Sequence, residues 1–226
     1  MLEIRNIQNA KHILLKTDSN SFANASAVYS YLLTLHKKAS ICFSEEVEPK
    51  FSFLPWYDKL KSVAPSSADI VIEINYEVLD YYKFFKENGV NINKKMATAL
   101  YSALLVRYEN FSSCDSDGMV FATANQLIEL GAQHKVAQTA IAKSDSLALF
   151  RLKAILYKNM LLVQSATEAE LFISDEELKA SGASMREAEK AMREVLSLAN
   201  VTKVTLKKSD EDMKIIKTLE EMQFEK

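Results

Sequence analysis

The sequence has little glycine, proline, cysteine or histidine. Four glycines and three prolines among 226 residues leave few breaks in regular structure, so we expect long helices and strands. The two cysteines, Cys42 and Cys114, form no CxxC pair, and His12, His36 and His134 are scattered. A zinc site is therefore not expected. We predict two free, buried thiols in a reducing compartment.

The chain also lacks a strong charge of either sign and a long apolar run. Its formal net charge is −2, which gives no overall attraction to nucleic acid or to an acidic membrane. No apolar run approaches the roughly 20 residues that a membrane-spanning helix needs. The opening MLEIRNIQNAKH lacks the basic and apolar segments of a secretory signal. We expect a cytoplasmic protein with no membrane association.

The apolar patterns predict an α/β protein of two domains, residues 1–144 and 145–226. Three compact apolar segments of the first domain are predicted strands: 12–17, 39–44 and 69–75. Amphipathic helices alternate with them, which is typical of a parallel sheet with helices on both faces. The β-branched segment DIVIEIN (69–75) is expected to be a buried strand.

The second domain begins with a linker helix and continues as a small α+β unit. Its predicted strands are 160–166, 169–174 and 201–208. Ser174 and Glu177 have capping-box spacing. The segment DEDMKIIKTLEEM (210–222) is expected to form a final helix. In the first domain, Ser21 and Ser116 are expected to cap the helices that follow them.

Several segments, taken in order, resemble the DHH phosphoesterase superfamily. LKTDSNSFANAS (15–26) is similar to the strand end and polar turn that carry the family motif T-H-x-N-P-D-x-D. DIVIEIN resembles the strand that follows, and NINKKMATALYSALLVRYENF (91–111) a later helix. AELFISDEELKASGAS (169–184) resembles the start of the DHH-associated domain. The branch that is most similar contains short-oligonucleotide ribonucleases and pAp phosphatases, which implies a catalytic domain followed by a substrate-holding one.

The departures from this family fall on its metal-binding positions. Lys16 stands where the motif has histidine, and Asn20 and Phe22 where it has aspartates. Asn75 replaces the strand-end aspartate and Arg107 the acid of D-T-G. The D-H-H segment and the later G-G-G-H motif have no counterpart, and a truncated DHH-associated domain is therefore expected. Two Mn²⁺ or Mg²⁺ ions need carboxylates and imidazoles, so the resemblance predicts the fold and argues against the family's reaction.

If the family's fold is kept, its old site becomes a vestigial cleft or an anion-binding site. The residues that would line it are Lys16, Asp18, Asn20, Ser21, Asn75 and Arg107. Asp18 could pair with Lys16 or Arg107 and plug the site. Alternatively, the cations could hold a phosphate or carboxylate, helped by the helix start near Ser21. No catalytic residue and no metal ligand is assigned.

Three functions remain open from the sequence. The leading hypothesis is a non-catalytic binding, regulatory or structural component without a cofactor, whose partner is a protein, a nucleotide or a second copy of the chain. A homodimer or hetero-complex is expected to use residues after about 160. The second is a metal-dependent phosphoesterase that acts on short oligonucleotides or pAp, with Mn or Mg held by Asp18, Glu73, Glu77 and Asp80. The third is a nucleic-acid-binding remnant that no longer cleaves.

Overall fold

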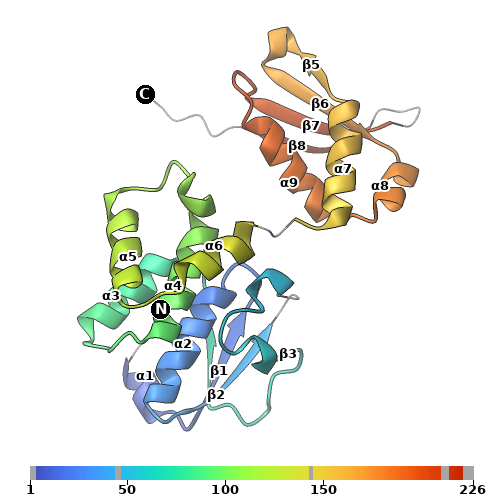
Figure 1. The fold of residues 1–226 in the computed structure, drawn as a ribbon. Helices are drawn as coiled ribbons and strands as arrows, with labels where there is room; N and C mark the ends of the chain where they lie inside the picture. The colour runs from blue at the N-terminus through green and yellow to red at the C-terminus, as the bar shows by residue number, and fades with distance from the viewer. Residues whose placement is uncertain (1–3, 44–46, 143–144, 210–213, 221–226) are drawn as a thin grey trace. The chain divides into compact units, whose positions relative to one another are not determined.

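The structure, a computed structural model, describes residues 4–43, 47–142, 145–209 and 214–220. It divides into two compact units, Met1–Ser144 and Asp145–Lys226, each with its own sheet and hydrophobic core (Figure 1). Among the described helices, none has both the length and the apolar character needed to cross a bilayer.

The first unit is built on a four-stranded parallel sheet with the strand order β3-β2-β1-β4. Its strands are β1 (His12–Thr17), β2 (Lys38–Phe43), β3 (Leu60–Lys61) and β4 (Ile70–Glu73). The predicted α/β class is thereby confirmed. A 3₁₀ turn, η2 (Tyr57–Lys59), leads directly into β3, whose two residues pair with β2.

One face of this sheet carries the main hydrophobic core. Leu15 of β1 lies opposite Ile41 and Ile72 on the neighbouring strands, and all three contribute to that core. Helix α2 (Phe22–Thr34) packs on β1 and β2, and α4 (Lys94–Arg107) packs on α2 (Figure 1). Side chains alternate along a strand, so Leu14 points to the opposite face. Leu14 is buried there but is not part of this core.

Strand β4 was expected to be buried, and this prediction is wrong. It is an edge strand, paired with β1 on one side and with no other described strand on its outer side. Val71 is 49% exposed and the side chain of Glu73 is 82% exposed. An edge strand can be β-branched and apolar because its inward side chains, here Ile70 and Ile72, still reach the core.

The remaining described elements of the first unit are helices and two short 3₁₀ turns. They are α1 (Ile4–Asn9), η1 (Pro49–Phe51), α3 (Val78–Glu87), η3 (Glu109–Phe111), α5 (Gly118–Glu129) and α6 (His134–Ala142). Ser116 does not cap α5 as predicted. Asp117 does so, because its carboxylate accepts from the backbone N–H groups of Met119 and Val120. Cys42 is buried, but Cys114 is exposed, so the prediction of two buried thiols is wrong for Cys114.

The second unit is a mixed sheet, with order β5-β6-β7-β8, packed against helices. Its elements are α7 (Leu147–Lys158), β5 (Leu161–Val163), η4 (Gln164–Ala166), β6 (Glu168–Ile173), α8 (Asp175–Ser181), α9 (Met185–Leu196), β7 (Lys203–Lys208) and β8 (Ile215–Glu220). Strands β6 and β7 are parallel, and the outer pairs are antiparallel. The predicted capping box of Ser174 and Glu177 is confirmed at the start of α8.

The final helix predicted for residues 210–222 is wrong for the part that the structure describes. Ile215–Glu220 is the edge strand β8, paired antiparallel with β7. Lys, Leu and Glu favour a helix locally. Pairing with β7 provides backbone hydrogen bonds along one side of the segment and overrides this preference. Residues 210–213 and 221–222 lie outside the described residues.

Two turns have left-handed backbone without any glycine. Glu109, Asn110 and Phe111 have φ of 49°, 57° and 67°, and residues 164–166 repeat this pattern in the second unit. A left-handed conformation brings Cβ close to the following carbonyl oxygen and costs about 1–2 kcal/mol per residue. The surrounding structure must therefore hold both turns in place.

Candidate functional site

The polar turn after β1 closes on itself. Asp18 accepts, through Oδ1, from the backbone N–H of Ser21 at 2.8 Å and from its hydroxyl at 2.8 Å. The Ser21 hydroxyl also accepts from the N–H of Asp18 at 3.1 Å and lies 2.9 Å from Thr17 Oγ1. Ser21 stands at the N-cap of α2, but its side chain makes no capping bond to the helix. Asp18 thus fixes the start of α2.

Lys16 projects from β1 toward the edge of the sheet. Its Nζ lies 3.9 Å from Oε1 of Glu73, the residue opposite it on β4. The two side chains are 46% and 82% exposed, so water screens the pair and it contributes about 0–1 kcal/mol to stability. Lys16 is therefore engaged with its neighbour on β4.

Arg107, at the end of α4, is held by two carboxylates and two aromatic rings. Its Nε lies 3.4 Å from Glu77 Oε1, and its Nη1 lies 3.5 Å from Asp115 Oδ2. The guanidinium carbon is 5.4 Å from the ring centre of Tyr76 and 5.0 Å from that of Tyr108. Desolvation would lower the pKa of Arg107, but the negative charges around it, Glu77 above all, raise that pKa overall. With 24% of its side chain exposed, Arg107 is a well-anchored cation.

Asn75 joins the end of β4 to two helices. Its backbone N–H donates to the hydroxyl of Tyr81 on α3 at 3.0 Å, and its carbonyl accepts from Asn24 of α2 at 3.0 Å. Its side-chain oxygen accepts from the N–H of Glu77 at 3.2 Å. Burial is the largest influence on Tyr81 and raises its pKa to about 12. Asn75 is thus a junction between elements, and Glu77 links it to Arg107.

The structure brings the six predicted residues into separate groups. Asp18 and Ser21 form the turn, Lys16 pairs with Glu73, and Asn75 is linked through Glu77 to Arg107. The ion pair considered between Asp18 and Lys16 or Arg107 does not form among the described residues, because the Asp18 carboxylate accepts from the backbone N–H and hydroxyl of Ser21 and the two cations pair with other carboxylates. Asn20 is exposed, and its side chain bonds to no other described residue.

The carboxylates that hold Arg107 are the part of this site that sequence reasoning missed. From the sequence, Glu77 is a candidate metal ligand only, and Asp115 is not expected to hold Arg107. One signal was available in the sequence. Glu77 follows the end of the predicted strand 69–75 by two residues. The resemblance puts Arg107, in place of an acid of the family, at the same site, so the two side chains could be expected to meet. A buried or half-buried arginine needs such partners.

The oxygen donors present here do not fit a pair of Mn²⁺ or Mg²⁺ ions. Asp18 Oδ1 already accepts two hydrogen bonds, and Glu73 and Glu77 each face a cation. Asp80 is exposed on α3. Within the described ranges, no three His, Cys, Asp or Glu side chains are grouped so that they could hold a metal. Two-metal catalysis needs several carboxylates and imidazoles around a shared centre, and these side chains do not converge on one.

Comparison with known proteins defines the class of fold. No protein-family model and no curated protein matches the sequence. Among solved structures, the chain is similar to an exopolyphosphatase-related protein from Bacteroides fragilis. The TM-score is 0.75 at 12% identity, over 93% of this chain and 79% of the other. The chain thus shares the fold of this exopolyphosphatase-related protein.

A second solved structure is a Methanococcus jannaschii protein assigned to the family II inorganic pyrophosphatases. Its TM-score is 0.42 at 12% identity, over 88% of this chain and 84% of the other. The likeness to the Bacteroides protein is what defines the fold, and at 12% identity it extends to the fold alone.

Proposed function

We propose that this protein is a non-catalytic relative of the DHH phosphoesterases, from the branch of short-oligonucleotide ribonucleases and pAp phosphatases, and that it acts as a binding or regulatory component. The observation that supports this is the charge arrangement at the strand ends. The resemblance aligns two cations, Lys16 and Arg107, with metal-binding positions of the family, and each of them pairs with nearby carboxylates. A pair of divalent cations would have to compete with both of them for these oxygens.

Hydrolysis assays with matched variants test this proposal. Purified protein is given Mn²⁺ or Mg²⁺ and incubated with short oligonucleotides and with pAp, and bound metal is measured by elemental analysis. We expect no stoichiometric metal and no turnover above a blank without protein. The variant Arg107→Ala serves as a control for latent activity, because it frees Glu77 and Asp115. Turnover by the unchanged protein that is lost in Asp18→Ala would favour the phosphoesterase alternative.

The proposed partner is a protein, and self-association is its simplest form. Both edges of the second sheet carry exposed apolar side chains, which supports an interface there. Leu161 and Leu162 of β5 are 55% and 50% exposed, and Ile215 of β8 is 58% exposed. Exposed edge strands pair readily with other chains. We expect a homodimer in light scattering at micromolar concentration, and expect Leu161→Ser with Leu162→Ser to weaken it. A monomer at all these concentrations, with no co-purifying protein, would contradict this.

A further inference from the structure

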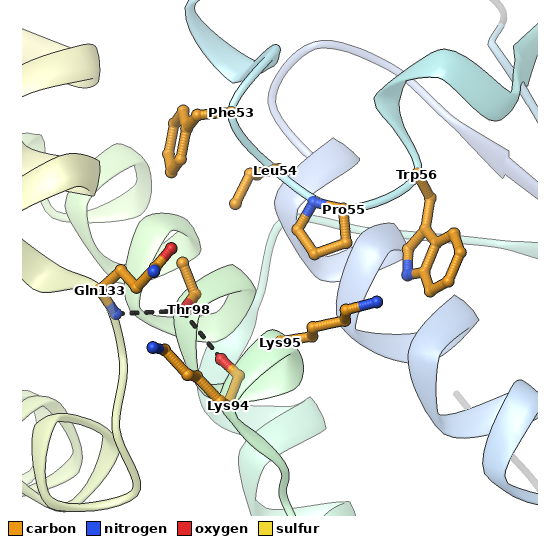
Figure 2. Close-up of a pocket in the computed structure, with 8 residues that line it drawn as sticks. All are labelled: Phe53, Leu54, Pro55, Trp56, Lys94, Lys95, Thr98 and Gln133. Atoms are coloured by element: carbon orange, nitrogen blue, oxygen red, sulfur yellow. Dashed lines mark hydrogen bonds between the residues drawn. The ribbon is translucent and has the colours of Figure 1, made fainter.

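A cavity of about 550 Å³ lies in the first unit, and it shares no residue with the strand-end site. The loop that includes Phe53, Pro55 and Trp56 forms one wall, and the start of α4 with Lys94 and Lys95 forms the other (Figure 2). This volume lies within the range of about 300–1,000 Å³ that is typical of small-molecule sites.

Trp56 is held in an unusual backbone conformation at this wall. Its φ is 72° and its ψ is 4°, which is the left-handed region that bulky residues avoid. The indole N–H donates to Ser30 Oγ at 2.8 Å, and the ring centre lies 5.2 Å from that of Tyr29 on the same helix. Strained residues that the surrounding structure holds firmly are concentrated at ligand sites.

The loop next to Trp56 is tied to the same helix. Ser26 of α2 donates through its hydroxyl to the carbonyl of Pro55 at 2.8 Å, and the Ser30 hydroxyl donates to the Ser26 carbonyl at 2.9 Å. The aromatic wall is therefore fixed by side chains of a buried helix. A ligand that stacked on it would not have to order the wall first, which lowers the cost of binding.

The opposite wall supplies positive charge without acids. Neither Lys94 nor Lys95 forms an ion pair with another described residue, and no carboxylate lines the cavity among those residues. Lys95 Nζ lies 4.7 Å from the ring centre of Trp56. The backbone N–H groups of Lys95 and Met96 donate to the side chain of Asn93, so the anion-binding capacity here comes from the two ammonium groups.

The floor between the walls is polar and rigid. The hydroxyl of Thr98 donates to the Lys94 carbonyl at 2.8 Å and accepts from the backbone N–H of Gln133 at 3.0 Å (Figure 2). Its hydrogen-bonding capacity is thereby used in joining α4 to the segment before α6. The Gln133 side chain also lines the cavity and offers an amide that can both donate and accept.

We propose that this cavity binds a phosphate monoester carried on a planar aromatic ring. Two ammonium groups without acidic partners match the charge of about −1.5 to −2 of a phosphate monoester better than the single charge of a carboxylate. The ring packs on Trp56 and Pro55, where aromatic stacking is worth about 0.5–1.5 kcal/mol beyond burial. Because Lys95 lies against the Trp56 ring, the phosphate and the ring are bound side by side.

The chain reports on this site by itself, because Trp56 is its only tryptophan. Intrinsic fluorescence is titrated with phenyl phosphate, inorganic phosphate, benzoate and phenol, and thermal unfolding is followed with the same compounds. A chelator is present throughout, so no metal-dependent hydrolysis occurs during the titration. The binding result therefore does not depend on whether the proposed function is correct. We expect saturable binding of phenyl phosphate with a rise in Tm, and affinity at least about tenfold weaker for each of the other three.

Matched variants locate the binding. Lys94→Gln with Lys95→Gln should weaken phenyl phosphate binding by about tenfold or more, while Lys61→Gln, an exposed lysine on β3, should leave it unchanged. Trp56→Phe keeps an aromatic ring, and the rise in Tm should persist there in reduced form. The proposal is overturned if phenyl phosphate neither quenches Trp56 nor raises Tm, if inorganic phosphate binds equally well, or if the lysine pair can be replaced without loss.

Discussion

Asp18 gives the sharpest test of the strand-end site, because the structure assigns it a structural role at the start of α2. Replacing Asp18 with alanine removes the acceptor for two hydrogen bonds of 2.8 Å from Ser21. Loss of an acceptor at a helix start costs about 0.5–2 kcal/mol. Hydrogen bonds to a charged group lie at the upper end of such effects, so we expect a loss of about 1–2 kcal/mol.

The assay is thermal and urea unfolding followed by the fluorescence of Trp56, which reports on the first unit alone. A loss of this size lowers Tm by about 3–6 °C in a unit of this length. Asp18→Asn keeps an oxygen acceptor and should lose less. Asn20→Ala is the matched control, because its exposed side chain bonds to no described residue, and it should stay within about 0.5 kcal/mol. If Asp18→Ala is as stable as Asn20→Ala, the assigned structural role is refuted.

Three further outcomes follow from the structure. Cys114 should react with a thiol reagent in the native protein well before Cys42, because burial raises the pKa of the Cys42 thiol more than nearby Lys16 lowers it; equal rates would contradict the described burial. Hydrogen bonds from the backbone of His12 and Lys11 lower the folded-state pKa of Asp69, so its contribution to stability is complete above the unfolded pKa of about 4 and is lost as pH falls through the lower folded value. In Asp69→Asn this loss of stability at low pH should be absent, and an acid-unfolding profile identical to that of the unchanged protein would contradict the prediction. Leu15→Ala, in the fully buried core, should cost about 2–5 kcal/mol in urea unfolding, and a cost under 1 kcal/mol would show that the site is not packed as described.

Much of the fold could be predicted from local patterns. The strands at 12–17 and 38–43, predicted at 12–17 and 39–44, are short apolar segments, and their periodicity separates them clearly from the helices around them. The strand at 215–220 could not be found this way, because its residues favour a helix until β7 offers a pairing edge. The edge position of β4 was hidden for a related reason, since strand order depends on contacts between distant segments.

For the candidate site, the sequence named some of the residues but not their contacts. Asn75 is linked to Arg107 through Glu77, whose role depends on how α4 ends beside the strand. The bond from Asp18 to Ser21 is a local preference of aspartate three residues before a helix start, and it could have been weighed against the ion pair. The Trp56 cavity is lined by three segments that lie far apart in the sequence, so no local sequence motif predicts it.

The two left-handed turns bear on the order in which the chain folds. Glu109–Phe111 and Gln164–Ala166 have a backbone that their own residues disfavour, so neither turn can guide the chain early. Each can close only after the elements on both sides of it have docked. We therefore expect them to form after the rate-limiting barrier, so that glycine at Asn110 or Ser165 would change the rate of unfolding and leave the rate of folding nearly unchanged.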